Sequence, residues 1–247
     1  MTRSTALITG ANKGIGLEIA RQLGEQNFAV WLGCRDQDRG EAAAAGLRAE
    51  GIEANCLVLD VTDANSIRSA AEHLQDQIGA LDALVNNAGM SFGRPSPASQ
   101  ESVDDMRAIF DVNVFGAVRV TQAFVPLLRK SAAARIVMIS SGLGSIASTL
   151  DMTSENWNVG SAGYCASKTA LNMFTVKFAK ELAADGIKVN AADPGLTATD
   201  LNGHMGSRAP RDAAAIAIRL ATLDKFGPTG GFFLNENADT RPPRQPW

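Results

Sequence analysis

Short apolar runs alternate along the chain with longer stretches in which apolar residues recur every three or four positions. The short runs are typical of strands buried on both faces, whereas the longer pattern is typical of helices with one apolar face. The pattern predicts strands at residues 5–9, 28–34, 54–60, 81–86, 135–140, 187–192 and 231–234. It predicts helices at residues 14–26, 38–50, 63–78, 103–130, 162–184 and 210–223, the third capped by Thr62 or Asp63 and the fourth kinked by Pro126.

This alternation of strand and helix predicts parallel strands joined by right-handed crossovers. We therefore expect an α/β fold, a Rossmann-type doubly wound parallel sheet of seven strands with helices on both faces. Residues 1–247 are expected to form a single domain, because the length suits one large α/β domain and neither a repeat nor a linker rich in Gly and Ser interrupts the pattern. The segment at 238–247 is either an ordered cover over the surface or a frayed end.

Composition and charge narrow the classes of partner. Apolar residues make up 45 % of the chain and the net charge is -3, so no basic field indicates binding to nucleic acid or to an anionic membrane. No apolar run approaches the roughly 20 residues needed to span a bilayer, and the first residues show no cleavage pattern of a signal peptide. We expect a cytoplasmic protein whose partners are small molecules.

The residue types that bind metals are scattered along the chain. Cys34, Cys56 and Cys165 form no Cys-x-x-Cys pair, and their odd number does not suggest a disulfide framework. Each is expected to be a small buried hydrophobe. His73 and His204 lie far apart in polar sequence, so no metal site is expected.

A glycine-rich turn joins the first predicted strand to the first predicted helix. Its glycines allow a tight turn, close approach of a pyrophosphate and close packing of helix on strand, while the helix N-terminus offers free N–H groups. The spacing is Gly-x-x-x-Gly-x-Gly, and a purely structural turn is the alternative. The candidate nucleotide-binding residues of this turn are Gly10, Asn12, Lys13, Gly14, Ile15 and Gly16.

The end of the second predicted strand bears on the choice between NAD and NADP. Folds that prefer NAD usually place an acidic residue there, on the ribose 2′-hydroxyl, but this strand ends in Arg35. Arg35 and the nearby Lys13 would suit a dianionic 2′-phosphate. The alternative is that both are solvated surface charges and that Asp36 reaches a bare ribose. We expect NADP(H).

Tyr164, the only tyrosine in the chain, stands four residues before Lys168. Four residues place both side chains on one face of a helix. A free phenol has a pKa near 10 and is a poor acid or base at neutral pH. A nearby ammonium stabilises the phenolate, so we expect Lys168 to lower the pKa of Tyr164.

Seven motifs occur in the order found in the short-chain dehydrogenases/reductases, and the chain resembles that family from Thr9 to Thr199. They are the Thr-Gly-x-x-x-Gly-x-Gly turn, Asp60-Val61, Asn86-Asn87-Ala88-Gly89, Asn113, Ser140-Ser141, Tyr164-x-x-x-Lys168, and Pro194-Gly195 followed by Thr197 and Thr199. Within the family, Arg35 and the Pro-Thr-Gly-Gly-Phe-Phe stretch at 228–233 resemble the NADPH-dependent carbonyl reductase branch.

The resemblance implies a role for each motif. Tyr164 would donate the proton to a carbonyl oxygen as hydride leaves the nicotinamide, and Lys168 would tune Tyr164 and hold the nicotinamide ribose. Ser141, rather than its neighbour Ser140, would hydrogen-bond the carbonyl oxygen, and Asn113 would anchor a water of a proton relay. The further cofactor-binding residues implied are Asp60, Val61, Asn87, Ala88, Gly89, Pro194, Gly195, Thr197 and Thr199.

The gap from Ser141 to Tyr164 is longer than is typical of the family, and we interpret residues 143–161 as an insertion. In the carbonyl reductase branch a longer insertion covers a helix face that other members use to oligomerise, so either a monomer or a homo-oligomer remains open. The insertion, residues 90–92 and residues 196–205 are expected to line the pocket. They are mostly apolar, which favours a neutral, fairly hydrophobic ketone, aldehyde or dicarbonyl.

Two other functions compete with a reductase. One is a catalytically silent NADP(H)-sensing or scaffold protein on the same fold, but such proteins typically lose the Tyr or the Lys. The other is a methyltransferase with a similar glycine turn, which the combination of Arg35, Asn-Asn-Ala-Gly and Tyr-x-x-x-Lys disfavours. The sequence thus predicts an NADP(H)-dependent oxidoreductase of carbonyl and alcohol groups.

Overall fold

The structure, a computed structural model, describes residues 3–91, 96–154, 156–235 and 246–247. At its centre lies a seven-stranded sheet in the order β3-β2-β1-β4-β5-β6-β7, with every neighbouring pair parallel. The predicted fold class is confirmed. The strands are β1 (Thr5–Thr9), β2 (Ala29–Cys34), β3 (Ala54–Val58), β4 (Ala83–Asn86), β5 (Arg135–Ile139), β6 (Lys188–Asp193) and β7 (Phe232–Leu234).

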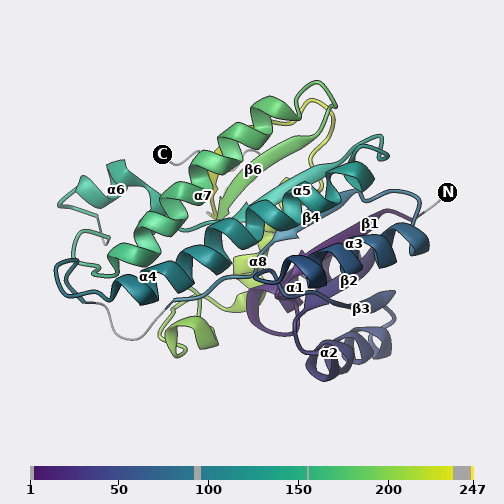
Figure 1. Cartoon of the computed structure of the whole chain (residues 1–247), viewed down its shortest axis with the longest axis horizontal. Helices are drawn as coiled ribbons and strands as arrows, with labels where there is room; N and C mark the ends of the chain where they lie inside the picture. Colours follow the sequence, from purple (N-terminus) through teal and green to yellow (C-terminus); the bar gives the residue numbers. More distant parts are fainter. Residues whose placement is uncertain (1–2, 92–95, 155, 236–245) are drawn as a thin grey trace.

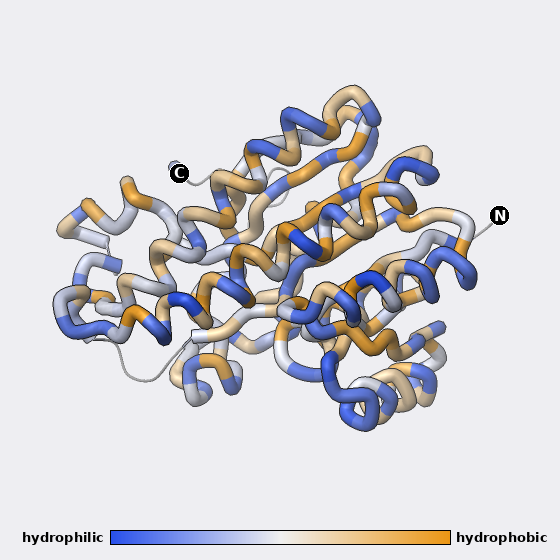
Figure 2. The backbone as a smooth tube through the Cα atoms, in the orientation of Figure 1, coloured by the Kyte–Doolittle hydropathy of each residue, from blue (hydrophilic) through white to orange (hydrophobic). Residues whose placement is uncertain are grey.

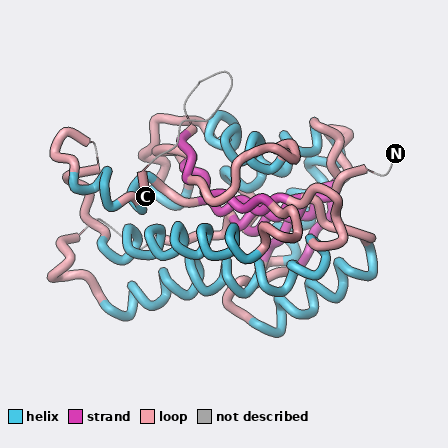
Figure 3. Tube along the Cα trace, turned by 90° about the horizontal axis from the view of Figure 1, so that it is seen from above, coloured by secondary structure: helices cyan, strands magenta, loops and turns pink. Residues whose placement is uncertain are grey.

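Helices cover both faces of the sheet (Figure 1, Figure 3). One apolar core joins the sheet to α1 (Gly14–Glu25), α2 (Gln37–Ala49) and α8 (Pro210–Ala221). A second core joins the opposite face to α3 (Ala64–Gln77), α5 (Ala117–Leu128) and α7 (Ala162–Glu181). The strands are coloured largely hydrophobic in Figure 2, and the helices alternate between polar and apolar residues, as expected where only one helix face meets the sheet.

The order of the strands predicts the crevice typical of open α/β sheets at the carboxyl ends of β1 and β4. The chain moves outward from β1 to β2 and β3, then returns to place β4 on the other side of β1. In open α/β sheets, ligands bind beyond the carboxyl ends of the strands at such a switch point. The glycine turn follows β1 and Asn87 follows β4, so the topology brings both motifs to this crevice.

The long predicted helix at 103–130 has an internal change of geometry. It begins as α4 (Val103–Phe110), widens into the π-helical segment η1 (Asp111–Gly116) and continues as α5. A π-helical turn holds one extra residue, which the apolar periodicity does not reveal. Asn113, a predicted site residue, lies inside this segment.

This same helix is more apolar than the sequence analysis expected. By length and composition Val103–Leu128 could cross a membrane, although half of its most apolar stretch is buried inside the protein. Its buried side chains, including Val120, Phe124 and Leu128, belong to the core beneath the sheet. Such burial is typical of a core helix, and composition alone does not distinguish the two.

Other differences lie at element ends and in loops. Asp63, rather than Thr62, caps α3 by accepting from the Asn65 N–H. Periodicity did not predict the short helices η2 (Gly142–Gly144), α6 (Ile146–Leu150) and η3 (Asp200–Asn202). Of the predicted tail, residues 238–245 lie outside the described residues, and the Trp247 ring stacks on Phe232 with centroids 5.7 Å apart.

The cysteine prediction holds for one position of three. Cys34 is buried, whereas Cys56 and Cys165 are partly exposed. Cys56 packs against the margin of a core and not inside it.

Candidate active site

The glycine turn is shaped by two positive φ angles and one close contact. Gly10 and Gly14 have φ of +63° and +58°, in the left-handed region that favours glycine. A Cβ on Gly16 would lie 2.5 Å from Asn87 Nδ2 and 2.6 Å from the Gly10 carbonyl oxygen. Gly16 therefore lets α1 press against the end of β4, as the sequence predicted for one of the three glycines.

The start of α1 is open to an anion. Lys13 is its N-cap, with extended backbone and no side-chain hydrogen bond to the first turn. The first N–H groups of a helix have no partner within it, and the positive end of its dipole lies there. This uncapped terminus and the space kept free by glycines fit a dinucleotide pyrophosphate. The predicted residues Asn12 and Ile15 flank it, both partly buried.

Thr9, which sequence reasoning did not single out as a site residue, joins the two sides of the crevice. Its hydroxyl oxygen accepts from the N–H groups of Asn87 and Ala88, at 3.0 and 2.9 Å. The Asn87 amide in turn donates to the carbonyl oxygens of Thr9 and Gly10, at 2.9 and 3.2 Å. Asn87 thus shapes the turn, and Gly89, two residues later, is exposed.

The groups at the expected adenosine ribose are not equally available. Arg35 is exposed, directly after β2. Asp36 caps α2 by accepting from the Arg39 N–H, at 3.0 Å, and also pairs with the Arg39 guanidinium. Lys13, predicted to face a 2′-phosphate with Arg35, is instead ion-paired with Asp200.

Asp60 and Val61 lie just after β3. The Asp60 carboxylate accepts from the Thr62 N–H and hydroxyl, at 2.9 and 2.7 Å, in a local turn. Val61 is buried against Gly116 of the π-helical segment, where a Cβ would lie 2.8 Å from Val61 Cγ2. Their observed contacts are therefore structural.

Tyr164, Ser141 and Lys168 come together between α7 and the end of β5. The Tyr164 side chain is hydrogen-bonded to Ser141. The neighbouring Ser140 is engaged farther along α7, where its buried hydroxyl donates to Asn172 Oδ1 at 2.6 Å. Lys168 is 4 % exposed and its Nζ lies 5.6 Å from the centroid of the Tyr164 ring.

Burial determines the pKa values of this pair. It raises the pKa of Tyr164, the charge of Asp193 raises it further, and the hydrogen bond from Ser141 opposes both. Burial also lowers the pKa of Lys168 to about 8, against the opposing effect of Asp193. The expectation that Lys168 lowers the pKa of the phenol is therefore wrong for the net shift, because desolvation dominates.

Asn113 is buried in the π-helical segment and ties it to the end of β4. Its Oδ1 accepts from the Met90 N–H at 2.8 Å, and its Nδ2 donates to the Met90 carbonyl and the Ser167 hydroxyl at 3.0 and 3.1 Å. A Cβ on Gly89 would lie 3.5 Å from Asn113 Oδ1 and 3.8 Å from Lys168 Nζ. Asn113 and Lys168 thus both lie close to Gly89.

The loop after β6 lies over the glycine turn. Pro194 is buried, and Gly195 has φ of +75° and donates its N–H to Asp193 Oδ1 at 2.9 Å. The buried Thr197 hydroxyl donates to the Gly195 carbonyl at 3.0 Å. Thr199 approaches Gly14, whose added Cβ would lie 3.7 Å from the Thr199 methyl. The structure thus gathers the predicted motifs at one edge of the sheet.

Comparison with known proteins agrees with this arrangement. The family model described as short chain dehydrogenase matches residues 4–209. The chain belongs to the short-chain dehydrogenase/reductase family. A short-chain dehydrogenase of Penicillium roqueforti, anuI, is 35 % identical, with 90 % of each chain covered. The (-)-isopiperitenone reductase of Mentha piperita is 32 % identical, covering 94 % of this chain and 96 % of its own length.

A solved structure supports the same family. The NADPH-bound carbonyl reductase from chicken fatty liver aligns over 100 % of both chains with a TM-score of 0.85 and 28 % identity. As a short-chain dehydrogenase/reductase, the chain is an oxidoreductase that uses a nicotinamide cofactor and a small-molecule substrate. In the part of the chain that the structure describes, no three His, Cys, Asp or Glu side chains gather as a metal site.

Exposed apolar side chains occur in two of the segments that the sequence predicted to line the pocket. The insertion exposes Leu150, Met152 and Trp157, and the loop after β6 exposes Leu196 and Met205. The insertion is tied to the helix that carries Tyr164, because the Gly144 carbonyl accepts from the side chains of Thr169 and Asn172. Phe92, also expected in the pocket, lies outside the described residues.

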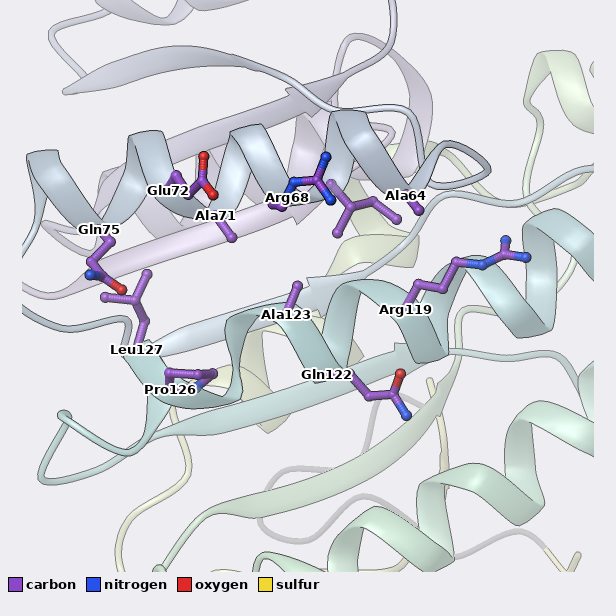
Figure 4. A pocket seen from close by; sticks show the side chains of 11 residues that line it. Ala64, Arg68, Ala71, Glu72, Gln75, Arg119, Gln122, Ala123, Pro126 and Leu127 are labelled. Carbon is purple, nitrogen blue, oxygen red and sulfur yellow. The ribbon is translucent and has the colours of Figure 1, made fainter.

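A separate groove of about 480 Å³ lies between α3 and α5, away from this site (Figure 4). Apolar side chains such as Ala71, Ala123 and Leu127 line it, and Arg68, Glu72 and Arg119 stand at its margin. None of the predicted site residues lines it.

Proposed function

We propose that the protein transfers hydride between the nicotinamide of NADP(H) and the carbonyl or alcohol carbon of a neutral, fairly hydrophobic substrate. The observation that carries this proposal is the Tyr164 phenol, hydrogen-bonded to Ser141 and close to the buried Lys168 ammonium. These groups lie between β5 and α7, at the edge of the sheet where the glycine turn fits a dinucleotide.

Tyr164 acts as the general acid in reduction. Because burial raises its pKa, the phenol is protonated at neutral pH, as a proton donor must be. When bound, the nicotinamide supplies the hydride that turns the substrate carbonyl into an alkoxide. Tyr164 gives its proton to that oxygen, and the Ser141 hydroxyl stabilises the negative charge as it develops.

Lys168 stabilises the phenolate that remains. Its ammonium is held near the Tyr164 ring by a hydrogen bond of 2.8 Å to the Ile139 carbonyl. A cation in a site of low dielectric stabilises a nearby phenolate more than it would in water. Asn113 anchors a water that links Lys168 to solvent as a proton relay. Its position close to Gly89 and Lys168 supports this role, and π-helical segments like the one that holds it are frequent at functional sites.

The proposed preference for NADP(H) rests on Arg35. Its side chain is exposed at the end of β2, whereas Asp36, the residue that would favour NAD, is engaged in capping α2. A guanidinium can bind a 2′-phosphate through two hydrogen bonds. A relative of known structure, the chicken carbonyl reductase, was solved with NADPH bound.

The proposed substrate class rests on exposed apolar side chains in the segments that the sequence predicted to line the pocket. Leu150, Met152 and Met205 are each at least 70 % exposed. Exposed apolar side chains that gather at a cleft are typical of a ligand-binding surface. Relatives of this chain are named for their action on isopiperitenone and salutaridine.

The test combines a substrate panel with Tyr164→Phe, which removes only the hydroxyl. Purified protein with NADPH should reduce neutral ketones faster than keto acids, and Tyr164→Phe should lower turnover by about 10²–10⁴-fold. The affinity for NADPH serves as the control and should change by less than about twofold, because the hydroxyl takes no part in phosphate binding.

Two results would contradict the proposal. Unchanged turnover in Tyr164→Phe would remove Tyr164 from the chemistry. Tight NADPH binding without turnover of any ketone, aldehyde or alcohol would favour the alternative of a silent NADP(H)-sensing protein. The ordered Tyr164, Ser141 and Lys168 argue against that alternative.

A further inference from the structure

The helix that carries Tyr164 starts without a cap of its own. Ser161, the residue before α7, makes no side-chain hydrogen bond to the first turn. Its φ of +102° lies in the left-handed region that favours glycine, so this serine is strained. The first N–H groups of a helix need a partner, which a local Ser, Thr, Asp or Asn usually supplies.

Glu101 supplies the missing cap from a different part of the chain. Both of its carboxylate oxygens lie 3.1 Å from the N–H of Gly163, the residue directly before Tyr164. Glu101 stands 62 positions earlier, just ahead of α4, and α4 packs against α7. A carboxylate at a helix N-terminus is favoured by the helix dipole as well as by the hydrogen bond.

The contact with Glu101 leaves no room for a side chain on Gly163. A Cβ on Gly163 would lie 2.8 Å from Glu101 Oε1 and 2.9 Å from Met106 Cγ. Just upstream, the Ser161 N–H donates to the Ser96 carbonyl at 3.4 Å, and a Cβ on Gly160 would lie 2.9 Å from that same oxygen. Three neighbouring positions before Tyr164 are therefore held against residues 96–106.

We propose that Glu101 is a positioning residue for the reaction, which caps α7 in place of a local residue and thereby fixes the Tyr164 ring. This inference rests on the proposed function of Tyr164. Side chains on a helix point back toward its N-terminus, so the Tyr164 ring lies over the very turn that Glu101 holds. When that turn loosens, the ring moves away from Ser141 and Lys168.

The role is one of geometry more than of charge. The groups that shift the pKa of Tyr164 are Asp193, Ser141 and Cys165, together with burial, and Glu101 is not among them. A neutral amide in place of the carboxylate would still offer an oxygen to the Gly163 N–H. Glu101→Gln should therefore keep the function that Glu101→Ala loses.

The single tyrosine makes the test direct. Fluorotyrosine incorporation places one fluorine label in the chain, on Tyr164, so one NMR resonance reports the ring without reference to activity. Glu101→Ala should shift and broaden this resonance and lower kcat by roughly tenfold to a hundredfold, while the Kd for NADPH stays within about twofold. Glu101→Gln should restore the resonance and most of kcat.

Asp104→Ala is the matched control. Asp104 is an exposed carboxylate in the first turn of α4, three residues after Glu101, and it accepts a hydrogen bond from the Arg107 guanidinium. This variant should keep the resonance and kcat of the parent protein. A change as large as that of Glu101→Ala would show that the loss of any negative charge near the start of α4 has the effect, and would overturn the proposal.

Further outcomes separate this inference from the proposed function. An unshifted resonance in Glu101→Ala overturns the positioning role even if the enzyme is active. Unchanged turnover in Tyr164→Phe overturns the proposed function but leaves the NMR comparison valid. If Glu101→Ala does not fold, Glu101→Asp should shift the resonance because its side chain is one methylene shorter, and Glu101→Gln should not. Equal shifts in both would overturn the proposal.

Discussion

The Lys168 ammonium donates to the Ile139 carbonyl, 2.8 Å away, while its Nζ lies 5.6 Å from the centroid of the Tyr164 ring. Lysine is thus tied to the backbone of β5 and acts on the tyrosine through its charge. This charge is buried, and burial lowers the pKa of Lys168 to about 8. The protein therefore holds a cation where the loss of solvation disfavours it. The folded protein should be less stable than one with an apolar side chain at this position.

Lys168→Met is expected to abolish turnover and to stabilise the fold below pH 8. The pKa of Lys168 falls from 10.5 to about 8 on folding, so between these values the unfolded chain binds more protons and wild-type stability rises with pH. Below about pH 8 the penalty is complete, up to about 3 kcal/mol before the lost hydrogen bond to Ile139 is subtracted. Urea unfolding should show a gain on the order of 1 kcal/mol at about pH 7.

The same gain should shrink as the pH rises from about 8 to 10.5 and vanish above that, where both folded and unfolded states of the wild type carry a neutral lysine. Lys177→Met is the control, since Lys177 is exposed on the same helix and should change stability by less than about 0.5 kcal/mol. A gain for Lys168→Met that does not depend on pH would contradict the argument from burial.

Gly16→Ala is expected to disrupt the cofactor site. The new Cβ would lie 2.6 Å from the Gly10 carbonyl oxygen and 2.5 Å from Asn87 Nδ2, and the backbone oxygen cannot move without opening the turn. We expect a loss of about 1–3 kcal/mol in unfolding free energy from overpacking, and a weaker affinity for NADPH and NADH alike. Thermal unfolding and fluorescence titration measure the two.

Gly46→Ala provides the matched control for that substitution. Gly46 lies inside α2, and an added Cβ would meet nothing within 4 Å. Alanine in an unobstructed helix interior should stabilise the fold by about 0.5–1 kcal/mol and leave cofactor affinity unchanged. If both variants behaved alike, the close contact at Gly16 would have no special role.

Features set by local spacing were predictable from the sequence. The glycine turn and the pair Tyr164 and Lys168 depend on residues at most a few positions apart, and helix geometry decides which of them share a face. The sheet was predictable because its strands are apolar throughout. By contrast, η1 could not be predicted without its hydrogen-bond register. The sign of the pKa shift of Tyr164 could not be predicted without its burial by distant segments.

Long-range polar contacts were the other features that the sequence did not reveal. Lys13 and Asp200 are 187 positions apart, and Glu101 and Gly163 are 62 apart. Both carboxylates stand in polar sequence that is typical of a solvated loop, and only the fold brings them to their partners. The sequence also carried no signal for Glu101, because Ser161, directly before the predicted helix, is itself a favoured type of N-cap residue.

Arg35→Ala is expected to change the cofactor preference. The guanidinium is exposed where the 2′-phosphate would lie, so its loss should lower kcat/KM for NADPH by about 10–100-fold, in line with charge-assisted hydrogen bonds of about 1.5–3 kcal/mol. Efficiency with NADH should change by less than about twofold, since NADH lacks that phosphate. Arg107→Ala, an exposed arginine on α4, should affect neither. Equal losses with NADPH and NADH would refute the role of Arg35.

Asp200→Asn is expected to tighten NADPH binding without affecting NADH. Asp200 pairs with Lys13 and, at 2.7 Å, with His204, and both partners lower the pKa of its carboxyl. If Lys13 contributes to binding the 2′-phosphate, the phosphate must compete with this carboxylate. Removing the charge frees Lys13, so the Kd for NADPH should fall severalfold, and more so at low salt because the groups are exposed.

Two further variants decide whether Lys13 carries this effect. His204→Ala removes the other partner of Asp200 and should leave the Kd for NADPH unchanged, because the pair with Lys13 stays. In a Lys13→Ala background, Asp200→Asn should have no effect on NADPH, since the two residues act through one contact. Weaker binding of both cofactors in Asp200→Asn would show instead that the ion pair favours binding. The pair joins the glycine turn to the loop after β6, and it would then hold that loop over the bound dinucleotide.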